Sequence, residues 1–190
     1  ENLFILPASQ TRDKDALTDE GVAEIMAELS KQFDFVICDS PAGIERGAQL
    51  AMYHADEAII VTNPEISSVR DSDRIIGILQ SRTKKIKEGT GTVREHLVIN
   101  RYNAERAERG EMMDIDSIAK DILKVPLLAV IPESESVLEA SNQGEPVILD
   151  KDSKAGQCYD DMIARFLGEE RPYRHIQVQK KGFLQRWFGG

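Results

Sequence analysis

The chain has 190 residues, of which 41% are hydrophobic and 30% are charged, and its formal net charge is -9. This length and composition are typical of a folded domain with a real core, and they exclude a disordered chain. The acidic balance disfavours nonspecific binding to DNA, which depends on neutralising phosphates.

Short apolar runs alternate with helical patterns. Helices are expected roughly over residues 19–31, 44–53, 67–82, 115–123, 137–141 and 154–167, and a charged surface loop over 84–92. Runs that are apolar throughout fit strands buried on both faces, so the alternation predicts an α/β fold with a doubly wound, mainly parallel sheet. The expected strands are 3–6, 35–38, 58–62, 97–99, 127–131 and 147–149.

The stretch from Phe33 to Gly43 is the most informative. It reads as a short strand that stops at Asp39 and turns through Ser40 and Gly43. Ligands of open parallel sheets bind beyond the carboxyl ends of the strands, and Mg²⁺ takes oxygen ligands while keeping several waters. The stretch therefore suits a Mg-nucleotide site, although Ser40 as a helix N-cap with Pro41 at the first helical position remains an equal alternative.

Polar side chains follow three further expected strands. In a parallel sheet these groups share one edge with Asp39. Each group by itself is ordinary turn chemistry, but four together favour a ligand crevice. They are Asn63, Pro64 and Glu65 after residue 62, Asn100, Arg101 and Tyr102 after residue 99, and Pro132 and Glu133 after residue 131.

Several familiar sites are missing from the sequence. A glycine-rich phosphate loop ending in Lys-Ser/Thr is absent, and so is GxGxxG, so either the ligand is not a nucleotide or the phosphate cradle lies upstream of Glu1. Two cysteines and three histidines lack metal-ligand spacing, so we expect no zinc site and a reducing compartment. The start at Glu1 suggests a fragment, or a processed or incompletely read product.

The end of the chain is basic and aromatic. Residues 171–190 carry +5 and the rest carry -14. The pattern predicts an amphipathic helix over 180–190 that lies in the plane of an anionic membrane, after a polar linker over 169–179; a helix docked on its own domain is the alternative. Two such tails held together would bind far more tightly than one. The apolar face is Phe183, Leu184, Trp187 and Phe188, and the basic flank is Lys180, Lys181 and Arg186.

The motifs resemble those of the MinD family, membrane-associated ATPases of the deviant-Walker P-loop group that help to place the bacterial division septum. The resemblance implies a P-loop NTPase-like domain over 1–168 that lacks the phosphate loop and the central strand. The isolated chain would then be less stable than its parent and inactive as an ATPase. The matching stretches are 2–15, 38–45, 62–65, 67–74, 140–147 and 180–183.

The resemblance also implies residue roles. Asp39 corresponds to the aspartate that holds Mg²⁺ through water, and Ser40 to Gly43 correspond to the switch that senses the terminal phosphate of ATP. Asn100, Arg101, Pro132 and Glu133 would frame the adenine; Asn63, Glu65 and Asp71 would lie near the dimer interface; Glu45, Asp73 and Asn142 would meet partners; and the basic, aromatic tail would bind lipid.

The implied partners are MinC, MinE, anionic membrane lipid and a second copy of the chain bound with ATP, with no nucleic acid. The implied location is the cytoplasm, peripheral on the inner face of the cell membrane. Three other functions remain open: a non-enzymatic module of the same fold that binds lipid and a protein, a flagellar-number regulator of the same group, and a DNA-partition ATPase. The acidic body and the tail argue against the last.

Overall fold

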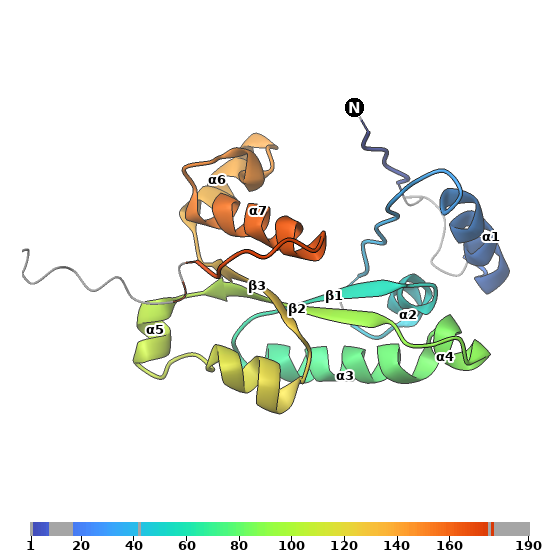
Figure 1. The fold of residues 1–190 in the computed structure, drawn as a ribbon, viewed down its shortest axis with the longest axis horizontal. Helices are drawn as coiled ribbons and strands as arrows, with labels where there is room; N and C mark the ends of the chain where they lie inside the picture. Colours follow the sequence, from blue (N-terminus) through green and yellow to red (C-terminus); the bar gives the residue numbers. More distant parts are fainter. Residues whose placement is uncertain (1, 8–16, 42, 175, 177–190) are drawn as a thin grey trace, which may run out of the picture. The chain divides into compact units, whose positions relative to one another are not determined.

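The computed structural model describes residues 2–7, 17–41, 43–174 and 176. The chain divides into two compact units (Figure 1). The first consists of Glu1–Asp56 and Ile78–Thr92, and the second consists of Glu57–Gly77 and Val93–Gly190.

A parallel sheet forms the framework of the second unit, with the strand order β1-β2-β3. β1 (Glu57–Thr62) pairs in parallel with β2 (Arg94–Tyr102), and β2 pairs in parallel with β3 (Leu127–Pro132). The prediction of strands at 58–62, 97–99 and 127–131 is confirmed, and so is the parallel α/β class.

Helices cover both faces of this sheet (Figure 1). On one face, α7 (Lys154–Phe166) packs its Ala155 and Cys158 against Val98, Leu128 and Ile131. On the other face lie the first part of α3 (Ile66–Arg82) and a π-helical turn at Ser117–Ile122. The middle of β2, Leu97–Ile99, and most of β3 are buried on both faces, which fits their apolar composition.

The start of α7 is the most tightly packed part of this unit. Ser153 caps the helix, since its side chain accepts from the N–H of Gly156. A Cβ at Gly156 would lie 2.4 Å from the carbonyl oxygen of Asp150 and 2.5 Å from that of Val147. Only glycine allows the helix to approach these carbonyls so closely.

Shorter elements complete the second unit: α5 (Ala104–Glu108), α6 (Glu135–Gln143) and a 3₁₀ turn at Val147–Leu149. The expectation of a strand at 147–149 is wrong. The carbonyl of Val147 accepts from the N–H of Asp150, which closes a turn instead. A run of three apolar residues does not by itself distinguish the two conformations.

The first unit contains α1 (Asp19–Leu29), α2 (Arg46–Tyr53), the end of α3 and α4 (Lys84–Glu88). Thr18 caps α1 by accepting from the N–H of Gly21. α4 lies where a loop was expected, and it ends at Gly89, whose φ of 66° is the left-handed conformation of a helix C-cap.

Two of the predicted strands do not form. Residues 3–6 and 35–38 are not paired as strands, and their apolar side chains are largely exposed: Leu3, Ile5, Phe35 and Ile37 are 62–89% accessible. A strand needs a neighbour to complete its backbone hydrogen bonds, and neither segment joins the β1-β2-β3 sheet. Both segments have the apolar composition of a strand, but composition alone does not form a strand without a neighbouring strand to pair with.

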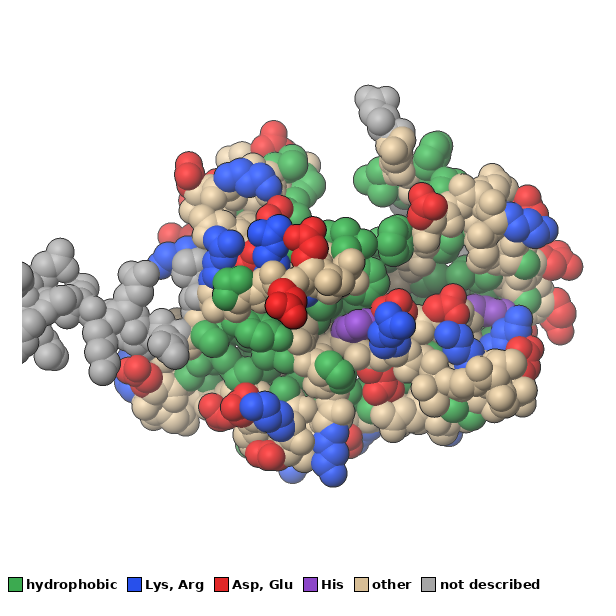
Figure 2. Space-filling view, in the orientation of Figure 1, with side chains coloured by type: hydrophobic (Ala, Val, Ile, Leu, Met, Phe, Trp, Pro, Cys, Tyr) green, Lys and Arg blue, Asp and Glu red, His purple; other side chains and the backbone are tan. Residues whose placement is uncertain are grey.

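The surface carries charges of both signs, interspersed on the visible face of the molecule (Figure 2). Within the described part of the chain, no helix combines the length and the apolar character that crossing a bilayer requires.

Gly156→Ala should lower the free energy of unfolding of the protein by about 1–3 kcal/mol, because the new methyl group overlaps two backbone carbonyls. Gly77→Ala is the matched control. Gly77 is exposed within α3 and has open space around its Cβ position, so this variant should gain about 0.5–1 kcal/mol. Urea denaturation measures both; equal effects would contradict the close packing at α7.

Candidate functional site

The carboxyl edge of the sheet brings several of the predicted site residues together. Tyr102 at the end of β2 pairs with Pro132 at the end of β3, and the N–H of Glu133 donates to the carbonyl of Tyr102 at 2.9 Å. Asn63 and Glu65 follow β1 at the same edge, where the N–H of Glu65 donates to the carbonyl of Asn63 at 2.8 Å.

Arg101 adopts an unusual backbone conformation at this edge. Its φ is 55°, and the pairing of β2 with β3 changes register between Ile99 and Tyr102, where β2 carries one residue more than β3. Such bulges re-aim side chains and are frequent beside binding sites. Here the Arg101 guanidinium lies 3.6 Å from the carboxylate of Glu133.

This ion pair is worth little for folding, because both side chains are substantially exposed, at 66% and 41%. A left-handed conformation costs a residue with a Cβ about 1–2 kcal/mol. The edge therefore holds a cation and a carboxylate in an arrangement that stability alone does not explain, and such strain is more often found at functional sites.

Tyr102, next to Arg101, was expected at this edge, but the sequence assigned it no role. It is 8% accessible, and burial, followed by the carboxylates of Asp114 and Glu108, raises the pKa of its phenol. The phenol therefore stays neutral at physiological pH. The left-handed conformation of Arg101 was also missed, because nothing in the sequence marks an arginine for positive φ.

Asp39, Ser40 and Gly43 belong to the first unit, whereas the carboxyl edge of the sheet belongs to the second. Asp39 and Ser40 are exposed, and Gly43 has a φ of 94°, which favours glycine strongly. α2 begins at Arg46 with Glu45 as its N-cap. The alternative that Ser40 caps a helix starting at Pro41 is therefore wrong.

This segment fits a hydrated Mg²⁺ better than it fits a fully protein-ligated metal. It offers one exposed carboxylate and one hydroxyl, which are hard oxygen donors. No group of three or more His, Cys, Asp or Glu side chains is gathered for a metal in the residues that the structure describes. Direct protein ligation of a transition metal would need such a group.

The residues expected at interfaces lie at the surface. Asp71 and Asp73 are exposed on α3, where Asp71 pairs with Arg74 at 3.4 Å. Asn142 is exposed near the end of α6, and Glu45 is exposed at the start of α2. The predicted tail residues, from Lys180 and Lys181 through Phe183, Leu184, Arg186, Trp187 and Phe188, lie outside the described part of the chain.

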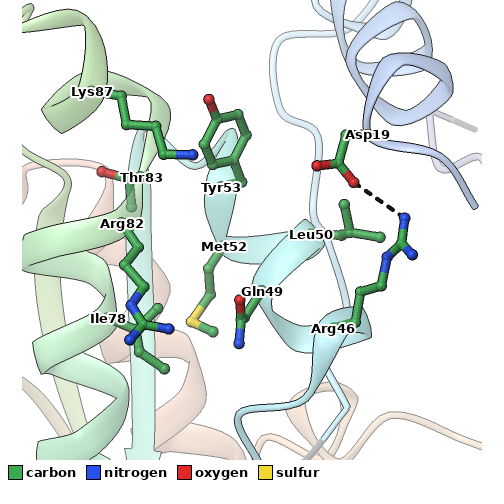
Figure 3. A pocket seen from close by; sticks show the side chains of 10 residues that line it. All are labelled: Asp19, Arg46, Gln49, Leu50, Met52, Tyr53, Ile78, Arg82, Thr83 and Lys87. Atoms are coloured by element: carbon green, nitrogen blue, oxygen red, sulfur yellow. Dashed lines mark hydrogen bonds and ion pairs between the residues drawn. The ribbon is translucent and has the colours of Figure 1, made fainter.

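A pocket of about 460 Å³ opens in the first unit between α1, α2 and the segment from Ile78 to Lys87 (Figure 3). Arg46 pairs with Asp19 at 3.3 Å across its rim, and the ammonium group of Lys87 lies 4.8 Å from the centre of the Tyr53 ring. Two of the cationic side chains that line the pocket, Arg46 and Lys87, thus already interact with other residues of the protein. None of the predicted site residues lines this pocket.

Comparison with protein families matches residues 8–147 to the CobQ/CobB/MinD/ParA nucleotide binding domain. A septum site-determining protein MinD from Escherichia coli (strain K12) is 59% identical over 191 aligned positions. The alignment covers 100% of this chain and 70% of that relative's length.

Solved structures agree with the sequence matches. A MinD cell division protein from Aquifex aeolicus superposes with a TM-score of 0.74 at 36% identity, over 84% of this chain and 65% of that one. A MinC:MinD complex from the same organism gives 0.67 at 39% identity, over 81% and 59%. MinD from Pyrococcus horikoshii OT3 complexed with Mg-ADP gives 0.63 at 31% identity, over 80% and 58%.

Arg101 and Lys124 provide a matched test of the carboxyl edge. Both have a φ of 55°, but Lys124 precedes β3 and so lies at the opposite edge. Glycine at either position should raise the free energy of unfolding by up to about 1 kcal/mol, because it tolerates positive φ.

Only Arg101→Gly removes the guanidinium from the carboxyl edge. We expect this variant alone to bind Mg-ADP roughly tenfold more weakly, a loss of about 1.4 kcal/mol. Urea denaturation and titration calorimetry on the complete protein measure the two effects. Equal nucleotide affinities of the two glycine variants would contradict a role for Arg101 at the site.

Proposed function

The chain belongs to the MinD septum site-determining proteins of the CobQ/CobB/MinD/ParA nucleotide-binding family, and from this premise we propose that the complete protein is an ATP-driven membrane switch. In this proposal ATP joins two copies, the paired tails bind anionic lipid, and hydrolysis releases them. The observation that carries the nucleotide part is the bulge that directs Arg101 to Glu133 at the carboxyl edge of the sheet.

The residues at that edge have the chemistry to frame an adenine. Asn100 and the backbone of Pro132 offer polar groups to the edge of a base, whereas Arg101 offers a planar guanidinium. The Arg101–Glu133 pair restrains both side chains before the ligand arrives. A restrained binding group loses less conformational freedom on binding, which favours affinity.

Asp39, Ser40 and Gly43 are proposed for the phosphate end of the nucleotide. The Asp39 carboxylate would hold Mg²⁺ through water, and Ser40 would supply a hydroxyl oxygen. Gly43 lacks a Cβ and already has positive φ, so its N–H is open to a phosphate oxygen. When bound, the metal neutralises the phosphate charge that develops during transfer to water.

Dimer and partner surfaces are proposed for the exposed polar residues. Asn63, Glu65 and Asp71 would face the second copy. Glu45, Asp73 and Asn142 would contact MinC, the septum inhibitor, and MinE, which stimulates hydrolysis. The MinC:MinD complex among the structural neighbours supports the first of these two partners.

The proposed location follows from the tail. Basic residues near an anionic surface contribute about 1 kcal/mol each, and each large apolar side chain contributes roughly 1.5–3 kcal/mol when fully buried. A single short helix also has to fold on binding, so it attaches reversibly. The protein would then move between the cytoplasm and the inner face of the cell membrane as nucleotide changes its dimeric state.

Asp39→Ala in the complete protein should lower ATP turnover at least about 100-fold, because the Mg²⁺ loses its anchoring carboxylate. Asp34→Ala removes the same group from the same segment and should leave turnover unchanged. Phosphate release with Mg-ATP and anionic vesicles measures this. Unchanged turnover in Asp39→Ala would remove Asp39 from the site, and no turnover in the unmodified protein would favour a non-enzymatic binding module.

Phe183→Glu should weaken ATP-dependent co-sedimentation with anionic vesicles at least about 30-fold, because it replaces a membrane-buried ring by a charge. Gln185→Glu adds the same charge off the apolar face and serves as the control. Nucleotide binding should not change in either variant. Vesicle binding by Phe183→Glu equal to that of the control would contradict the membrane role of the tail.

A further inference from the structure

A polar strap, residues 169–174, follows α7 and is tied back to the second unit. Arg165 projects from α7, and its Nη1 donates to the carbonyl of Leu128 at 2.6 Å. Its Nε and Nη2 donate to the carbonyls of Arg171 and Pro172 at 2.9 and 2.7 Å. One guanidinium thus joins α7, β3 and the strap.

Tyr173 forms a second tie between the strap and β3. Its hydroxyl donates to the carbonyl of Leu127 at 2.6 Å, and the Arg165 guanidinium lies 4.3 Å from the centre of its ring. The ring therefore binds the same arginine that its neighbours in the strap bind through their carbonyls. These contacts cooperate because each holds the guanidinium in the plane that the others require.

Asp161 forms the third tie, and it is nearly inaccessible, at 1%, on the buried side of α7. Nη2 of Arg174 donates to its Oδ1 at 3.2 Å. Nε of Arg174 lies 2.7 Å from Oδ2, which has no hydrogen bond within the described residues, so this second contact is electrostatic. A buried carboxylate without its cation is costly, so Asp161 requires Arg174 to stay docked.

The ties made by Arg165 and Tyr173 lie at one end of the sheet. Leu127 and Leu128 begin β3, whereas Pro132 ends it. At about 3.3 Å per residue, the two ends of β3 are roughly 17 Å apart. These two ties therefore hold the strap, which precedes the basic, aromatic tail in the sequence, away from the edge that is proposed to hold the nucleotide.

We propose that the strap is a positioning device, which fixes the point at which the tail leaves the domain and so keeps its tether short. This inference rests on the lipid-binding tail proposed above. With the strap docked, eight residues, 175–182, separate it from Phe183; without docking, fifteen residues, 168–182, separate α7 and its cap from Phe183. In a dimer, the effective concentration of the second tail falls roughly as the −3/2 power of tether length, which gives about 2.5-fold.

Asp161→Asn in the complete protein tests the strap without altering the tail. It removes the charge that holds Arg174 and keeps the shape of the side chain. The lipid concentration for half-maximal binding to anionic vesicles with ATP should rise about 2.5-fold. Asp160→Asn is the control: it makes the same charge change on the same helix, at an exposed carboxylate that pairs with Lys151. It should leave lipid binding unchanged.

The direction of the change in lipid binding distinguishes release of the strap from the simple loss of a negative charge. Removing a negative charge near an anionic surface would leave lipid binding equal or make it tighter, whereas release of the strap weakens it. Tyr173→Phe, which removes only the bond to Leu127, should weaken lipid binding in the same direction. Nucleotide affinity should remain unchanged in all three variants, which also shows that they fold.

Docking itself is measured by trypsin cleavage after Arg174, with the fragments identified by mass spectrometry. A guanidinium paired with Asp161 is withheld from the protease, so cleavage there should be at least threefold faster in Asp161→Asn than in Asp160→Asn. Equal cleavage, or equal lipid binding, in these two variants would overturn the strap. Absence of vesicle binding by the unmodified protein would instead overturn the membrane function, and the strap's role with it.

Discussion

The two parallel ladders that meet at β2 are the interaction on which the second unit depends. β1 and β3 each hydrogen-bond only to β2 within the described sheet, so neither would remain a strand without it. The ladders also set the direction of the strands, and with it the edge at which polar residues gather. The register change before Tyr102 belongs to this arrangement, because it lets Arg101 turn toward Glu133 without breaking the pairing of Tyr102 with Pro132.

β3 links the two ends of the proposed mechanism. Its carboxyl end carries Pro132 and Glu133, beside the proposed adenine position, and its amino end accepts the hydrogen bonds of Arg165 and Tyr173. Because a buried strand is stiff, the nucleotide and the membrane attachment would be held at a fixed separation. Nucleotide would then act on the membrane by pairing two copies rather than by moving one tail, since pairing raises the effective concentration of the second tail.

Charge is distributed in keeping with this arrangement. Most of the chain is acidic, whereas residues 171–190 carry +5. An acidic body is repelled by anionic lipid, so the proposed attachment would depend on where the basic segment begins and how far it stands from the body. In the proposal above, the pair formed by the buried carboxylate of Asp161 and Arg174 would set that starting point, with Arg174 as one of the basic residues of this segment.

The class of fold, the family and the residue types at the strand ends could be predicted from the amino-acid sequence. The strands at 97–99 and 127–131 were predictable because burial on both faces demands uninterrupted apolar runs. The run at 58–62 is equally apolar, although Ile59 and Val61 are exposed in the described structure. The main helices followed from their periodicity. Four features became known from the folded chain alone. Residues 3–6 and 35–38 are unpaired, 147–149 is a turn, Arg101 has positive φ, and residues 169–174, expected as part of a linker, are docked. The docking of residues 169–174 depends on partners distant in the chain, as Leu127 is from Tyr173. The turn at 147–149 is closed locally, by the N–H of Asp150, where the apolar run suits a strand equally well. The local sequence pattern gives the composition of a segment, whereas its pairing and burial depend on which other segments of the chain pack beside it.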